Sequence, residues 1–271
     1  MVRSAVKYAQ IVFGLSGLIL SGDVRSVWAY IPPSQFIIKT WVNKHSGAKT
    51  IRIKNTVTGY ESGKPSEIHF KETTLINLET SSMKSWASDD TDKKLYTVDK
   101  KLPTSSLAAK LLLSRDVEEL TRSLRQAGIP IRVDSELSVL RTEAERMKSE
   151  QTLLSRWNSG YAWVIGATTS RNQIWFEKDT FLPMRLVHEA VEWRFESFRF
   201  AREFPYPRMT HLLKNGDLVL VSQLQDLAPD TDPSHFRTSS PGMDAGAFTD
   251  QGNRASSGLK DLIRTYYEHI R

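Results

Sequence analysis

The stretch IRIKNTVTGYESGKPSEIHFK, residues 51 to 71, alternates apolar with polar side chains on both sides of a turn-rich middle. Successive side chains of a strand point to opposite faces of its sheet, so a period of two is typical of a strand with one buried face. Residues 59 to 65 supply the glycine, serine and proline that favour a turn. The stretch therefore predicts an antiparallel hairpin with one solvent-exposed face. Its apolar members are Ile51, Ile53, Val57, Ile68 and Phe70.

Similar patterns extend in both directions from this hairpin. Apolar side chains at helical spacing predict a helix from Pro33 to a stop at Gly47, and a longer helical stretch over residues 104 to 127 with a break at 114 to 116. A slip in the aromatic phase predicts a bulge or bend near Glu196 and Ser197. Short β-type runs predict strands over residues 74–79, 84–87, 94–98, 131–133, 138–140, 161–165, 173–177, 184–195, 199–204 and 218–224. Together these elements predict an α+β fold, an antiparallel sheet covered by helices.

Residues 1 to 29 have the three parts of a secretory signal. Arg3 and Lys7 precede an apolar run over residues 9 to 20, and Val27-Trp28-Ala29 supplies a cleavage site. The run is shorter than the roughly 20 residues that a spanning helix needs, and no later stretch reaches that length. We therefore expect cleavage near Ala29, with an uncleaved anchor as the alternative. The mature chain is then expected to be exported, periplasmic or beyond, and soluble, with no integral membrane segment.

The remaining chain divides into three parts. Residues 30 to 228 contain the predicted sheet and helices and are expected to form one domain. Residues 229 to 258 are rich in Asp, Ser, Pro, Gly and Thr, a composition typical of a flexible linker. Residues 259 to 271 return to helical spacing and predict a short amphipathic helix. Because so short a helix is unstable alone, it is expected to dock on the domain, on an envelope protein partner or on a membrane surface.

Composition removes several classes of function. The chain has 37 Lys and Arg against 31 Asp and Glu, a formal charge of +6, and the segment 1 to 29 contributes two of these charges. The remaining surplus is scattered among carboxylates, which is typical of a solvated surface and argues against a nucleic-acid partner. The absence of cysteine excludes disulfides, thiolate metal sites, a cysteine nucleophile and a lipid anchor on cysteine.

The motifs of enzymes and metal proteins are missing or incomplete. His188-Glu189-Ala190-Val191-Glu192 lacks the second histidine of a zinc helix, and the six histidines are scattered singly. The aspartates at 89 to 92 and at 226 to 232 do not follow the helix-loop-helix calcium pattern. We therefore expect no catalytic residue, no metal and no cofactor. A hydrolase stays as the least favoured alternative, and it would need His188 or His211 beside a carboxylate and a nucleophile.

The unusual feature of the chain is its set of aromatic strands. Trp163, Trp175 and Trp193 lie on predicted strands, with further tyrosines and phenylalanines beside them. One interpretation is a plain core between sheet and helices. The other is that a curved sheet has more inward apolar surface than its helices cover, which leaves a cavity for a lipid-like ligand.

Two stretches resemble the periplasmic lipoprotein-carrier family and its outer-membrane receptor relatives, the lipoprotein-sorting proteins. Residues 88 to 98, SDDTDKKLYTV, with Pro103 and the helix after Ser106, resemble the family's turn, short aromatic strand and lid-type helix. Residues 172 to 186, NQIWFEKDTFLPMRL, resemble its second hairpin. The likeness spans residues 33 to 228. It implies an incomplete β-barrel wrapped over helices on its concave side, sheltering acyl chains in an apolar cavity. The absence of cysteine fits a soluble carrier rather than an anchored receptor.

We therefore expect an exported envelope protein that binds an acyl chain, a lipid or a lipoprotein noncovalently, as a carrier or chaperone. The alternative is a structural or interaction protein with a packed core, whose C-terminal helix docks on an envelope partner. The residues expected to line the cavity are Ile68, Phe70, Leu95, Leu112, Trp163, Ile165, Trp175 and Phe195.

Overall fold

The structure is a computed structural model, and it describes residues 31–45, 48–102, 105–132, 152–158, 160–166, 170–229 and 246–271. The signal and cleavage site predicted before residue 30, the strand predicted at 138–140 and most of the predicted linker lie outside these residues. Within the described chain, no helix has the length and apolar character needed to cross a membrane.

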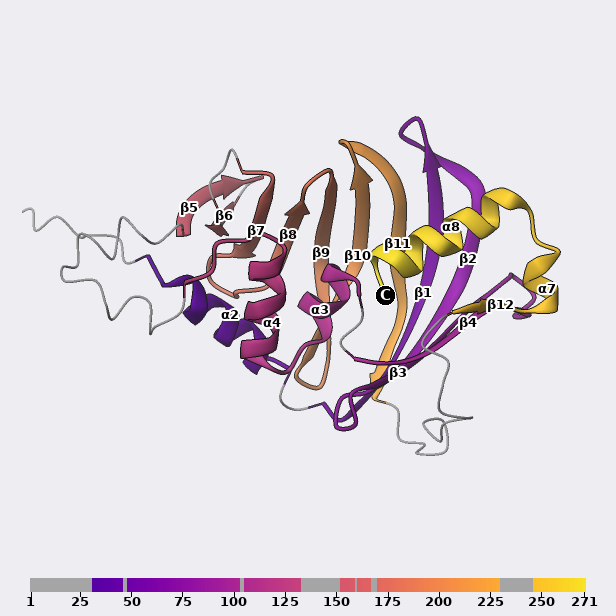
Figure 1. Cartoon of the computed structure of the whole chain (residues 1–271), viewed down its shortest axis with the longest axis horizontal. Helices are drawn as coiled ribbons and strands as arrows, with labels where there is room; N and C mark the ends of the chain where they lie inside the picture. Colours follow the sequence, from indigo (N-terminus) through magenta and orange to yellow (C-terminus); the bar gives the residue numbers. More distant parts are fainter. Residues whose placement is uncertain are drawn as a thin grey trace, which may run out of the picture. The chain divides into compact units, whose positions relative to one another are not determined.

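Twelve strands form one antiparallel sheet (Figure 1). The first four make a meander, the next seven make a second meander, and β11 pairs with β1 to join the two. β5 and β12 are the two edges, so the sheet does not close into a barrel. The strands are β1 (Thr50–Glu61), β2 (Lys64–Asn77), β3 (Ser82–Ser88), β4 (Lys94–Lys101), β5 (Thr152–Trp157), β6 (Gly160–Ile165), β7 (Asn172–Glu177), β8 (Pro183–His188), β9 (Val191–Ala201), β10 (Phe204–Lys214), β11 (Asp217–Pro229) and β12 (Ala247–Phe248).

The predicted fold class is confirmed: the chain is α+β, with a curved antiparallel sheet that carries helices on its concave face. These helices pack into one apolar cluster with the strands. They are α2 (Ser34–Asn43), α3 (Leu107–Leu113), α4 (Val117–Gln126) and α8 (Ser257–His269), and a single turn, α7 (Asp250–Asn253), packs beside β4.

The hairpin predicted at residues 51 to 71 is β1 and β2, and it is longer than the prediction. Ile51 pairs with Ile76 and Val57 with Phe70, so the apolar side chains share one face. The strands continue through the predicted turn to a two-residue connection at Ser62 and Gly63, both at positive φ. Such a connection matches the right-handed twist of the strands that it joins.

The prediction of one strand over residues 184 to 195 is wrong. β8 and β9 are separated there by a turn at Glu189 and Ala190, and Glu189 has a φ of 55°. The side chain of Asn172 stabilises this turn, because its Oδ1 accepts from the Glu189 amide at 2.9 Å. The bend expected near residues 196 and 197 is present at Ser197, which also has a positive φ of 53°.

The interrupted helical stretch is confirmed as α3 and α4. The Ser106 side chain caps α3 by accepting from the Ala109 amide, and the Asp116 side chain caps α4 by accepting from two amides of its first turn. Residues 131 and 132 are not a strand, and β5 was not predicted from its sequence. In the predicted linker, residues 246 to 258 form β12, α7 and the start of α8, so the helix begins at Ser257 rather than at 259.

Candidate functional site

Helix α8 covers the concave face of β1, β2 and β3 (Figure 1). Its inner side chains are buried, and so are the two residues that follow it, Ile270 and Arg271. The Tyr266 ring lies edge-on to Phe70, with 5.5 Å between ring centroids. We call the sheet residues that meet this helix the α8 surface; they are Asn55, Gly59, Ile68, Phe70, Glu72 and Ser85.

The sequence of α8 explains why it lies flat on this surface. The Ser256 side chain accepts from the Leu259 amide and so caps the first turn. The buried side chains then recur at helical spacing on one side, at Leu262, Ile263, Tyr266 and Tyr267. Gly258 allows the helix to approach the sheet closely, because a methyl group there would lie 2.7 Å from the Ile68 Cδ1 atom.

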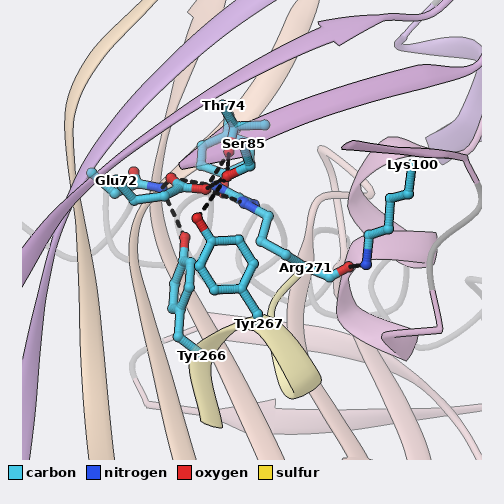
Figure 2. A network of polar contacts seen from close by, with 9 residues as sticks. Glu72, Thr74, Ser85, Lys100, Tyr266, Tyr267 and Arg271 are labelled. Carbon is cyan, nitrogen blue, oxygen red and sulfur yellow. Dashed lines mark hydrogen bonds and ion pairs between the residues drawn. The ribbon is translucent and has the colours of Figure 1, made fainter. Parts of the chain in front are cut away.

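An ion pair with no solvent exposure lies at the end of this helix (Figure 2). Arg271 Nε donates to Glu72 Oε1 at 2.7 Å, and its Nη2 donates to Oε2 at 3.1 Å. The third nitrogen, Nη1, donates to the Tyr206 hydroxyl at 2.8 Å. Such a two-pronged contact fixes the geometry of both groups.

The sheet itself supplies neutral donors to the same carboxylate. Asn55 Nδ2 donates to Glu72 Oε2 at 2.9 Å, and Ser85 Oγ donates to Oε1 at 3.0 Å. The Thr74 hydroxyl donates to Oε1 as well. All of these side chains are buried. Strands β1, β2 and β3 therefore hold Glu72 in place independently of α8, whereas its cationic partner comes from the end of α8.

Charge and burial act in opposite directions on this network. Burial disfavours the charged form of Arg271, but the Glu72 carboxylate and the Tyr206 and Tyr266 hydroxyls together outweigh burial and hold the pKa of Arg271 well above its ordinary value. Burial raises the pKa of the Tyr206, Tyr266 and Tyr267 hydroxyls, which therefore stay protonated near neutral pH. The site is thus one carboxylate and one guanidinium among neutral donors.

The last residue of α8 and the chain after it are also held through their backbone. The carbonyl of His269 accepts from Ser106 Oγ at 2.6 Å and from Trp193 Nε1 at 3.0 Å. A backbone oxygen of Arg271 accepts from Lys100 Nζ at 3.0 Å (Figure 2). Burial lowers the pKa of Lys100, and the Arg271 charge lowers it further. Strands β4 and β9 and the cap of α3 therefore all contact the end of α8.

The structure places seven of the eight residues predicted to line a cavity on two faces of the sheet, and the eighth, Leu112, on α3. Ile68 packs against the main apolar cluster, and six others are buried in it; these six are Phe70, Leu95, Leu112, Trp163, Ile165 and Phe195. Trp175 instead lies in a small cluster with Ala162 and Val164, away from the helices. Because side chains alternate along β7, its neighbours Ile174 and Phe176 belong to the main cluster.

Three cavities near the helices lie beside these residues rather than among them. One of about 150 Å³ lies next to α3 and includes Leu78 and Leu113, and one of about 480 Å³ lies along α4. A third, of about 270 Å³, lies between β4 and α8 and is lined by Tyr96, Val98, Lys100, Gly246, Arg264, Tyr267 and Glu268. None of the three includes any of the eight predicted residues. The α8 surface itself is filled by α8.

The two histidines of the least favoured hypothesis lie on different strands and have different polar neighbours. His188 Nδ1 lies 3.3 Å from the Asn172 amide oxygen, and His211 Nε2 lies 4.0 Å from a Glu196 carboxylate oxygen. Within the part of the chain that the structure describes, no group of three or more His, Asp or Glu could hold a metal ion.

Sequence reasoning missed Glu72, Asn55 and Arg271. A signal for the first two was present: Asn55 is in phase with Ile53 and Val57, and Glu72 is in phase with Phe70. A polar side chain on the apolar phase of a strand must be buried with a partner. The register then places Asn55 directly opposite Glu72.

No family model and no curated protein matches the chain. Among solved structures, a LolA superfamily protein from Nitrosomonas europaea is similar, with 11% identity and a TM-score of 0.46 over 77% of this chain and 98% of the other. An outer membrane lipoprotein-sorting protein domain from Vibrio parahaemolyticus has 9% identity and a TM-score of 0.43 over 75% and 95%. A DUF1329 family protein from Desulfovibrio piger has 9% identity and a TM-score of 0.38 over 73% and 92%.

Proposed function

We propose that the chain is an exported carrier or chaperone that binds an acyl chain, a lipid or a lipoprotein noncovalently on its concave face. One observation carries the proposal: the apolar concave face of β1 to β3 is covered by a separate amphipathic helix rather than by another sheet. If α8 moves away from the sheet, a ligand with an apolar surface can take its place.

The energy of such binding comes from apolar burial. Each acyl methylene removed from water contributes about 0.8 kcal/mol, so a long chain offsets a substantial ordering cost. The cleft between β4 and α8 offers a route to the face, because it reaches Tyr267 beside the α8 surface. No bond is made or broken in this scheme.

A structural or interaction role is the second candidate, and the filled α8 surface favours it. In that case the apolar cluster is a permanent core, and α8 or its outer side docks on an envelope protein. The two candidates differ in whether the protein binds small apolar molecules: a carrier binds them, and a permanently packed core does not.

The test is to purify the exported protein without detergent and to identify bound lipid or acylated peptide by native mass spectrometry. A carrier is expected to retain acyl species, or to take up a fluorescent fatty acid added in solution. Protein that carries no lipid and binds no such probe would overturn the proposal. The same preparation tests export, because its measured mass is expected to equal that of a chain that begins at Tyr30.

A further inference from the structure

Glu72 is a full negative charge on a surface that is otherwise apolar or neutral. Its neutral donors Asn55, Thr74 and Ser85 come from the sheet, and its cation comes from Arg271 at the end of α8. A ligand that takes the place of α8 therefore meets a preformed carboxylate that has lost its guanidinium. The α8 segment thus shows what the surface accepts: an apolar body followed by one cation.

Lys100 is the other cation close to this end of the helix. In the structure its ammonium donates to a backbone oxygen of Arg271 rather than to Glu72. It belongs to β4 and stays with the sheet when α8 leaves. Its partly buried ammonium contacts the backbone of the residue that pairs with Glu72, so the Lys100→Gln variant belongs in any test of what Glu72 binds.

We propose that the ligand of the α8 surface is a cationic amphiphile: its apolar part replaces α8, and its ammonium or guanidinium replaces Arg271 on Glu72. This inference rests on the proposed function and adds the chemical class of the ligand. An amphiphile without a cation must leave a buried carboxylate unpaired, which is strongly unfavourable, and an anionic one adds like-charge repulsion. We expect the cationic form to bind on the order of tenfold to a hundredfold more tightly than a neutral form of equal chain length.

The first experiment compares three probes with one alkyl chain and three head groups: dodecylammonium, a neutral dodecyl glycoside and dodecanoate, all below their micelle concentrations. Calorimetric dissociation constants for the full chain at pH 7 are expected to be lowest for the ammonium. Glu72→Gln keeps the size of the side chain and removes its charge, so the preference is expected to fall to within about twofold. Glu79→Gln is the matched control, because Glu79 is an exposed carboxylate paired with Lys49, and it should keep the preference. Lys100→Gln should keep or enlarge it.

The second experiment asks whether α8 must move. Ile68 and Gly258 face each other across the interface, and the chain has no cysteine of its own, so Ile68→Cys with Gly258→Cys provides a reducible cross-link. The oxidised protein is expected to bind no probe, and reduction is expected to restore binding. Mass spectrometry of the free thiols confirms the state, and this experiment does not depend on the Glu72→Gln variant.

The outcomes separate the inference from the function on which it rests. If all three probes bind the wild type equally, or if the oxidised and reduced forms bind alike, the inference is overturned and the proposed function stands. An Arg271→Gln variant, in which the ion pair that holds the end of α8 is weakened, is measured as well. If no probe binds the wild type, the reduced cysteine variant or Arg271→Gln, the proposed function fails and the inference fails with it.

Discussion

Arg271 Nε lies 2.7 Å from Glu72 Oε1, and neither side chain has any exposed surface. The two residues are 199 positions apart in the chain, so this ion pair joins β2 to the end of α8. A buried pair of this kind stabilises little by itself, because desolvation offsets much of the attraction. Removing only one of the two residues lowers stability strongly, because the other charge then stays buried without a partner. The pair therefore acts on where α8 sits more than on how stable the fold is.

The first prediction concerns this asymmetry. Arg271→Met leaves the Glu72 carboxylate buried without its cation, and the free energy of unfolding is expected to fall by about 3 to 5 kcal/mol. The double variant Arg271→Met with Glu72→Gln removes the stranded charge and is expected to lose less than Arg271→Met alone. Urea unfolding followed by circular dichroism measures both.

The control for this pair is Arg264→Met. Arg264 lies on α8, shortly before Arg271, but its ion pair with Asp261 is exposed, at 64% and 71% of the two side chains. Its loss is expected to change stability by no more than about 0.5 kcal/mol. A double variant that is less stable than Arg271→Met would contradict the account of a stranded charge.

Local patterns predicted most elements because the constraints that make them are local. The hairpin of β1 and β2 follows from alternation, and the break between α3 and α4 follows from the Asp116 cap. The turn between β8 and β9 was missed because Glu189 adopts positive φ without a glycine to signal it. Its support comes from Asn172, which belongs to a neighbouring strand of the folded sheet.

Of the polar site around Glu72, the sequence allows the buried residues of the sheet to be predicted, but not the cation that pairs with them. The phase of Asn55 and Glu72 on apolar strands shows that both are buried and need partners. The identity of the cation is not encoded in that phase, because a single arginine after a helix resembles any surface residue. Similarly, the alternation of β7 separates Trp175 from Phe176, but it does not say which of the two faces the helices cover.

The second prediction concerns pH. Burial, and then the charge of Arg115, lowers the pKa of His45 from 6.5 to about 3. The unfolded chain therefore binds a proton below pH 6.5 that the folded chain refuses until about pH 3, so stability falls as the pH falls through this window. At pH 5 the loss relative to pH 7.5 is about 2 kcal/mol from this residue alone.

His45→Leu tests this prediction. The side chain packs against the Trp41 and Phe204 rings, so leucine fills apolar space there and removes the proton. The stability of the variant is expected to change less between pH 7.5 and 5 than that of the wild type. His69→Gln, a change at an exposed histidine, should leave the wild-type slope in place. An unchanged slope in His45→Leu would show that other groups cause the acid sensitivity.

The third prediction concerns the docking of α7 on β4. A methyl group on Gly252 would overlap the Leu95 carbonyl oxygen, which already accepts from the Thr249 amide at 3.0 Å. Because the obstacle is backbone, Gly252→Ala is expected to separate α7 from β4 and to destabilise the fold by about 1 to 3 kcal/mol. Gly160→Ala is the matched control, since its methyl group would meet nothing closer than 3.9 Å. Equal melting temperatures for the two variants would contradict the close contact.

The last prediction uses two apolar residues on opposite faces of the sheet. Phe70 lies beneath Tyr266 on the α8 surface, whereas Trp175 lies in the small cluster with Ala162 and Val164. Both Phe70→Leu and Trp175→Leu are expected to lower stability by about 1 to 3 kcal/mol, because both side chains are almost fully buried. Only Phe70→Leu removes surface that an alkyl ligand would contact, and it is expected to raise the dissociation constant of dodecylammonium about fivefold. Trp175→Leu should leave this constant within about twofold of the wild type, since the sheet separates it from the ligand. Equal effects of the two variants on affinity would show that binding follows stability alone, and a larger effect of Trp175→Leu would move the ligand to the other face.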